Sequence, residues 1–162
     1  SGTQAQRGRG RKMSRSRYYG DSEERALALW VKLARAYSTF NKGTVQDIRR
    51  YGLTQPQFAV LECLGHLGPM MIGELSRKML VSGSNMTCVV DNLERDGLVE
   101  RQHDANDRRS VIVALTDKGR ALLEELFPQH VAFIANAVSA LTPEEQSQLA
   151  HLLKKLGTSL KE

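Results

Sequence analysis

Hydrophobic side chains recur every three or four positions through most of this chain, and this spacing is typical of amphipathic helices. The first such stretch covers about residues 21–50, and the second begins at Thr54. Each start carries a capping-box pattern, with Glu24 three residues after Asp21 and Gln57 three residues after Thr54. We therefore expect a long first helix capped by Asp21 and a shorter second helix capped by Thr54. The apolar positions of the first helix are Leu27, Trp30, Leu33, Ala34 and Tyr37.

Two short helices separated by a turn at 81–83 are predicted in the middle of the chain, over about 72–79 and 84–95. On the second of them the apolar residues form one stripe, which we expect to face the core. The opposite side carries small and polar groups and no lysine or arginine. The apolar stripe consists of Met86, Val89, Val90 and Leu93, and the polar side of Ser84, Asn85, Thr87, Cys88, Asp91 and Asn92.

A β-hairpin is predicted after Gly97, which ends the preceding helix. Its limbs are expected at about 98–102 and at 110–115, where the second limb is rich in branched residues that favour extended structure. The segment between them is polar and turn-forming, so the hairpin should end in a long charged tip. That tip contains Asp107, Arg108 and Arg109.

Leucine-rich helices are predicted for the rest of the chain. One should run over about 117–141 and be kinked by Pro128, because proline removes a backbone donor and clashes with the preceding turn. The last helix follows Thr142, with Pro143 in the first helical position and a glutamate completing the capping box.

A helix, a turn, a helix with a polar outer side and a hairpin with an arginine-bearing tip occur in the order of a winged helix. The major groove of DNA admits one helix, and a wing can reach the neighbouring minor groove. Each part alone has a simpler explanation, since amphipathic helices commonly pack into a core and charged tips commonly only face water. Their order is what favours DNA binding.

Composition narrows the classes of protein. The chain of 162 residues, with 41% hydrophobic and 25% charged residues, has the size and balance of one globular domain. No apolar run approaches the roughly 18 residues of a membrane span. Cys63 and Cys88 lie far apart without a partner motif, so we expect no disulfide framework, no structural zinc site and a cytoplasmic, nucleoid-associated location.

The net charge of +5 comes from the beginning of the chain. Residues 1–20 hold six of the 23 basic residues and no acidic one, so the remaining 17 basic residues face 18 acidic ones. Residues 1–20 are also rich in glycine and serine, and we expect a disordered basic tail. An argument for DNA binding must therefore depend on particular arginines in the folded part.

Specific motifs follow the same order. They are Leu75-Ser76, residues 93–101 reading LERDGLVER, Asp107-Arg108-Arg109, and residues 115–119 reading LTDKG. On these residues the chain resembles the MarR (multiple-antibiotic-resistance regulator) family over about 22–157. The resemblance implies a mainly α fold with a small β-hairpin. It places a winged helix-turn-helix lobe at 53–116 and dimerisation helices at 21–52 and 117–162, all within one domain over 21–162.

The resemblance also implies a homodimer that acts as a ligand-responsive repressor on a pseudo-palindromic operator in double-stranded DNA. The recognition helix would enter the major groove, where Asn85 can pair with adenine. At the wing, Asp107 would hold Arg109 in a minor groove, while Arg108 would serve a phosphate or a subunit contact. The expected DNA-binding residues are Ser84, Asn85, Thr87, Cys88, Asp107, Arg108 and Arg109.

A small effector, often aromatic or phenolic, is a further implication of the resemblance. Trp30, Tyr37, Tyr51 and His66 would line its cleft, although the same aromatic residues also suit an ordinary core.

Three other classes of function fit less well. The four histidines are scattered and no phosphate-binding loop or His-Glu-x-x-His motif occurs, so we expect neither an enzyme nor a cofactor. Glu62, Cys63 and His66 share one helix and could ligate a metal ion, yet Cys63 falls on the apolar side and suits a small buried residue. A winged helix that binds only proteins would have the same fold, but the arginine wing favours DNA.

Overall fold

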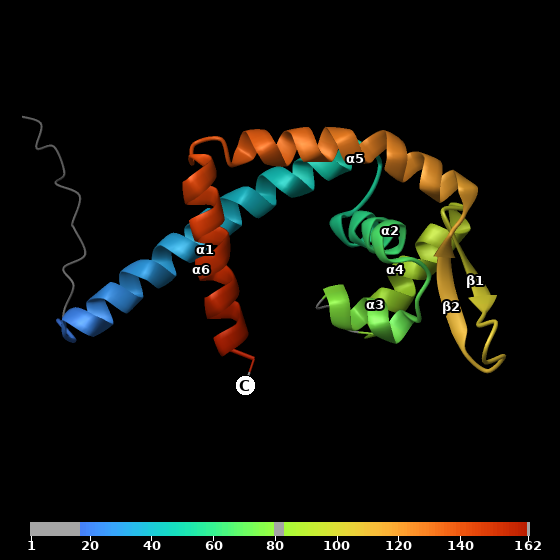
Figure 1. Cartoon of the computed structure of the whole chain (residues 1–162), viewed down its shortest axis with the longest axis horizontal. Coiled ribbons are helices and arrows are strands. Elements are labelled where there is room, and N and C mark those ends of the chain that lie inside the picture. The colour runs from blue at the N-terminus through green and yellow to red at the C-terminus, as the bar shows by residue number, and fades with distance from the viewer. Residues whose placement is uncertain (1–16, 80–82, 162) are drawn as a thin grey trace, which may run out of the picture. The chain divides into compact units, whose positions relative to one another are not determined.

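The computed structural model describes residues 17–79 and 83–161, and within α4 the side chains of Gly83 and Ser84 lie outside the description. Most of the expected basic tail, and the turn expected at 81–83 apart from Gly83, also fall outside the described residues. The described part is mainly helical with a two-stranded hairpin, as predicted (Figure 1). Its elements are α1 (Asp21–Arg49), α2 (Gln55–Leu67), α3 (Ile72–Met79), α4 (Gly83–Arg95), β1 (Val99–His103), β2 (Val111–Leu115), α5 (Asp117–Ala137) and α6 (Pro143–Ser159).

Some predicted element ends were wrong by a few residues. Helix α1 includes Asp21, and the Glu24 N–H donates to the Gly20 carbonyl, so Asp21 belongs to the first turn and does not precede the helix. Both strands begin one residue later than predicted. Helix α5 ends at Ala137 because the chain turns there, with the Leu141 N–H bonded to the Val138 carbonyl.

The chain divides into two compact parts, one ending at Thr39 and the other beginning at Phe40. The first part contains the N-terminal portion of α1, where the expected apolar positions Leu27, Trp30 and Tyr37 are exposed.

The hydrophobic core lies in the second part, between α2, α3, α4 and the hairpin. The predicted apolar stripe of α4 is confirmed, since Met86, Val90 and Leu93 are fully buried and Val89 is partly buried. Thr54 caps α2 through the predicted capping box with Gln57. The buried side chains of α4 hold one side of this helix against the core and leave its other side at the surface. The other fully buried side chains are Ile48, Val60, Leu61, Leu75, Val99 and Val113.

The hairpin is tied to the segment before α3. Strands β1 and β2 are antiparallel, with Val99 opposite Leu115 and His103 opposite Val111. Met70 adds a bridge on the other side of β2: its N–H donates to the Val113 carbonyl at 3.2 Å, and the Val113 N–H donates back at 2.8 Å. The wing is therefore held to the helical part by backbone bonds at its base.

The start of α5 is bonded to the turn between α4 and β1. The Thr116 hydroxyl donates to the Gly97 carbonyl at 2.6 Å and accepts the Gly119 N–H at 3.0 Å. The Lys118 ammonium donates to the Asp96 carbonyl at 2.8 Å, near the C-terminal end of α4. The LTDKG motif is thus a junction that joins three elements.

Helix α5 continues through Pro128 and changes direction along its length (Figure 1). Helix α6 starts with the predicted capping box of Thr142 and Glu145. None of the described residues of α6 is buried, although the helix carries a row of leucines.

Candidate nucleic-acid interface

The side of α4 opposite the core is a polar surface. Asn85, Thr87 and Cys88 are exposed there, and Asp91 continues the same side one turn later. Cys88 is a free thiol with the Asn92 side-chain nitrogen 3.9 Å from its sulfur. Because Met86, Val90 and Leu93 anchor the helix, this outer side is presented on a rigid element.

The wing tip carries the two arginines of the predicted site, Arg108 and Arg109, both exposed. Asp107 accepts the Arg109 backbone N–H at 2.9 Å and the Ser110 hydroxyl at 3.0 Å. We expected this carboxylate to bond the Arg109 guanidinium. Among the described residues, its bonds instead go to the backbone and side chain of its own turn. An Asp side chain commonly bonds a backbone N–H two residues later, and this local bond fixes the loop.

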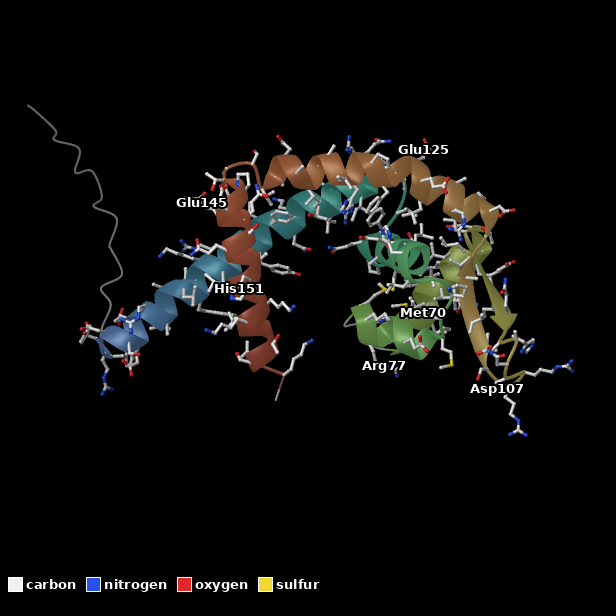
Figure 2. The ribbon with its side chains drawn as sticks, viewed as in Figure 1. Met70, Arg77, Asp107, Glu125, Glu145 and His151 are labelled. Atoms are coloured by element: carbon white, nitrogen blue, oxygen red, sulfur yellow. The ribbon has the colours of Figure 1, made fainter. Side chains whose placement is uncertain are left out.

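Two basic residues that the sequence argument missed lie in the last turn of α3. Arg77 and Lys78 are exposed and belong to the helix that precedes the recognition helix. Figure 2 shows Arg77 on the same lower edge of the lobe as Asp107 at the wing tip. Lysine and arginine side chains supply many of the phosphate contacts in protein–DNA interfaces, so this basic pair was available in the sequence as a candidate for such contacts.

Arg101 is a second functional candidate that the sequence argument left out. It lies on β1 and contacts α4, where it bonds Asp91 at 2.6 Å and Glu94 at 3.0 Å. The hydrogen bond to Asp91 is the largest of the causes that raise the pKa of the guanidinium.

The four expected effector residues are divided between the two parts of the chain. Trp30 and Tyr37 belong to the first part, and both are exposed. Tyr51 and His66 belong to the second, where the Tyr51 hydroxyl donates to Gln129 of α5 at 3.3 Å. The His66 ring packs edge-on against Phe127, with ring centroids 4.8 Å apart.

Two buried polar groups near these aromatic residues were also missed by the sequence argument. Asp47 is 4% exposed and one of its oxygens pairs with Arg50. Within the described residues, its other oxygen and Nδ1 of His130 have no hydrogen-bond partner. The His130 ring lies 4.7 Å from the ring of Phe58. Unpaired buried polar atoms are uncommon in folded proteins, and each one calls for an explanation such as a functional role or a bound water or ion.

A metal site is not favoured by the side chains that the structure describes. Among them, no group of three His, Cys, Asp or Glu residues is placed to hold a metal ion. Cys63 is half-buried, with its sulfur 3.9 Å from that of Met70, and burial raises the pKa of its thiol. Across 17–79 and 83–161, no helix is both long and apolar enough to span a membrane.

Comparison with known proteins finds the MarR family and transcription regulators in sequence and in structure. The family model described as MarR family matches residues 53–111. The HTH-type transcriptional regulator YkoM of Bacillus subtilis (strain 168) is 39% identical over 145 residues, which covers 90% of this chain and 94% of that protein. The crystal structure of Sco3205, a MarR family transcriptional regulator from Streptomyces coelicolor in complex with DNA, has a TM-score of 0.78 at 24% identity and covers 92% and 94% of the two chains. The structure of Bordetella bronchiseptica BpsR, whose DNA binding is regulated by 6-hydroxynicotinic acid, has a TM-score of 0.74 at 30% identity and covers 86% and 97%.

Proposed function

This chain belongs to the MarR family of DNA-binding transcription regulators, and from that premise we propose that it is a ligand-responsive repressor that binds a pseudo-palindromic operator as a homodimer. Its relatives are transcription regulators and not enzymes. The observation that carries the proposal is that one lobe exposes two elements, one suited to the major groove of DNA and the other to the minor groove. These are the polar outer side of α4 and the arginine tip of the β1–β2 hairpin.

In the proposed complex α4 lies in the major groove and the wing follows the backbone into the adjacent minor groove. Asn85, Thr87 and Cys88 would face base edges. Arg109 would enter the minor groove, and Arg108 would contact a phosphate. Arg77 and Lys78 of α3 would add phosphate contacts that orient the lobe.

Selection of duplexes from a random-sequence library by the purified protein, followed by mobility-shift titration, tests the proposal. We expect a recurring sequence with two-fold symmetry, because a dimer presents two copies of α4 to successive grooves. Equal affinity for the selected and the unselected duplexes would contradict sequence-specific regulation.

Arg109→Ala is expected to weaken binding to the selected duplex by about tenfold to a hundredfold, or roughly 1–3 kcal/mol, which is the scale of one specific contact. Folding should not change, since the side chain is exposed at the tip. Asp107→Ala should weaken binding less, because it loosens the turn and leaves the arginine charge in place. Mobility-shift titrations at fixed salt measure both losses.

The salt dependence provides the control for this prediction. Loss of a plain phosphate contact would weaken all duplexes alike and lower the salt slope by about one unit. Arg109→Ala should instead weaken the selected duplex more than random DNA. Wild-type affinity of this variant at physiological salt would show that the wing does not read the operator.

A dimer is proposed because α6 leaves a leucine row exposed, with Leu152 at 51% and Leu153 at 43% exposure. An apolar surface of this kind is a common interface between subunits. We expect light scattering to give twice the 18.1 kDa chain mass for the wild type and the monomer mass for Leu152→Glu/Leu156→Glu. Lys154→Glu, which also adds a negative charge to α6 but lies off the leucine row, should remain dimeric. A folded wild-type monomer at micromolar concentration would refute the dimer. The row consists of Leu149, Leu152, Leu153, Leu156 and Leu160.

The effector proposed here is a small aromatic or phenolic compound. The regulation of BpsR by 6-hydroxynicotinic acid supports this class by analogy. In this chain Tyr51, His66 and the buried polar atoms of Asp47 and His130 offer stacking surfaces and hydrogen-bonding groups for such a ring. Failure of a panel of phenols and aromatic acids to release the selected duplex would count against this class of effector.

A further inference from the structure

We infer that Arg101 is a positioning residue for DNA binding, because it neutralises two carboxylates on the recognition helix α4 and so lets that helix approach the phosphates. The inference rests on the proposed function, DNA binding through α4 and the hairpin. Arg101 itself need not touch DNA in this arrangement.

The contact geometry assigns one carboxylate to each terminal nitrogen of the guanidinium. Nη2 lies 2.6 Å from Asp91 Oδ1, and Nη1 lies 3.0 Å from Glu94 Oε1. The Arg101 side chain is 26% exposed, while those of Asp91 and Glu94 are 55% and 43% exposed. A planar, delocalised guanidinium can bridge two carboxylates in this way, whereas a lysine ammonium is a single compact charge.

Arg101 reaches α4 from the middle of the hairpin. Arg101 is the central residue of β1 and pairs with Val113 of β2, which is itself bonded to Met70. Asp91 and Glu94 are three residues apart on α4 and therefore lie on neighbouring parts of its surface. The bridge therefore lies between the helix that would enter the major groove and the strand that leads to the wing tip.

The electrostatic consequence appears only when DNA approaches. Surface ion pairs contribute little to folding stability, and both carboxylates of this bridge are exposed, so the bridge is not needed to hold the fold. Asp91 lies one turn beyond Thr87 and Cys88 on the outer side of α4, where an uncompensated carboxylate would face phosphates. Like charges brought together at an interface are strongly unfavourable, and the repulsion grows as water is displaced.

The alternative role for Arg101 is a direct phosphate contact, and a set of charge variants separates the two. The probe is a duplex that the wild-type protein has selected from a random-sequence library. Arg101→Gln should lower affinity for it about tenfold, because two carboxylates lose their counter-charge beside the phosphates. Arg101→Lys should fall between this variant and the wild type, because an ammonium cannot serve both carboxylates in the same geometry.

Rescue is the decisive measurement. Adding Asp91→Asn and Glu94→Gln to Arg101→Gln should restore affinity to within about threefold of the wild type, because no free carboxylate then faces DNA. Asp91→Asn/Glu94→Gln with Arg101 present completes the cycle and should bind at least as tightly as the wild type. Thermal unfolding midpoints that match across the set exclude a folding defect as the cause.

Two results would overturn the inference. If the triple variant binds as weakly as Arg101→Gln, Arg101 contacts DNA directly. If Arg101→Gln and Arg101→Lys both bind as the wild type, the bridge has no part in binding. Arg109→Ala on the same duplex distinguishes failure of this inference from failure of the proposed function. If Arg109→Ala loses affinity and Arg101→Gln does not, this inference is refuted and the proposed function stands. If the wild type selects no duplex at all, both are refuted.

Discussion

Gly119→Ala is expected to lower the free energy of unfolding by about 3 kcal/mol or more, at the upper end of what overpacking a core produces. A methyl group at this position would lie 2.0 Å from the carbonyl oxygen and 2.9 Å from the carbonyl carbon of Leu98. That carbonyl also accepts the Thr116 N–H at 3.1 Å, so it cannot move away without breaking the junction between β1 and α5. Since whole domains are stable by only about 5–15 kcal/mol, this loss removes a large part of the folding stability.

Gly73→Ala is the matched control, because it adds the same methyl group to another helix of the same lobe. Its nearest neighbour would be the Arg77 guanidinium at 3.8 Å, which is ordinary contact. Denaturant titration should show unchanged or slightly higher stability, since alanine is the better helix former. Equal stability of the Gly119 and Gly73 variants would show that the close approach at Leu98 is not a structural constraint.

Alkylation of Cys88 with iodoacetamide is expected to reduce affinity for the selected duplex by more than about a hundredfold, which exceeds the loss of one specific contact. The thiol is exposed on the outer side of α4, and the major groove is only about 12 Å wide. An added group there would hold the helix out of the groove and so remove every base contact together. Mobility shift after measured modification tests this.

Cys88→Ser should bind normally and resist the reagent. Cys63, the other cysteine, is half-buried, and burial raises the pKa of its thiol, so it should react slowly near neutral pH and faster as the pH rises. Mass spectrometry distinguishes the two sites. Equal loss of binding in the treated wild type and the treated Cys88→Ser protein would show that this thiol is not responsible.

Local signals in the sequence were enough to predict the elements. The capping boxes of Thr54 and Thr142 mark helix starts, and both are present in the structure. The spacing of apolar residues predicted which side of α4 is buried. These signals act within one or two helical turns, and such short-range preferences can be read from consecutive residues.

Element ends were less predictable, because neighbouring segments decide them. Strand β1 begins at Val99, where backbone pairing with Leu115 begins. The α5 helix stops at Ala137, although the spacing of apolar residues suggested a longer helix. Leu115 lies far along the chain from Val99, and the carbonyls of Val138 and Leu141 after α5 accept the Gln146 side chain of α6, so the local pattern reveals neither set of partners.

The candidate site also divides into features that the sequence predicts and features that depend on tertiary packing. The sequence by itself determined the family motifs, the polar outer side of α4 and the charged wing tip. Only the tertiary structure decided that Asp107 bonds the backbone of its own turn and that Arg101 bridges Asp91 and Glu94. It also decided that Gly119 must lack a side chain beside Leu98. Each of these facts depends on the distance between groups that packing brings together. A polar side chain has several possible partners in the sequence, and the folded backbone decides which of them it contacts.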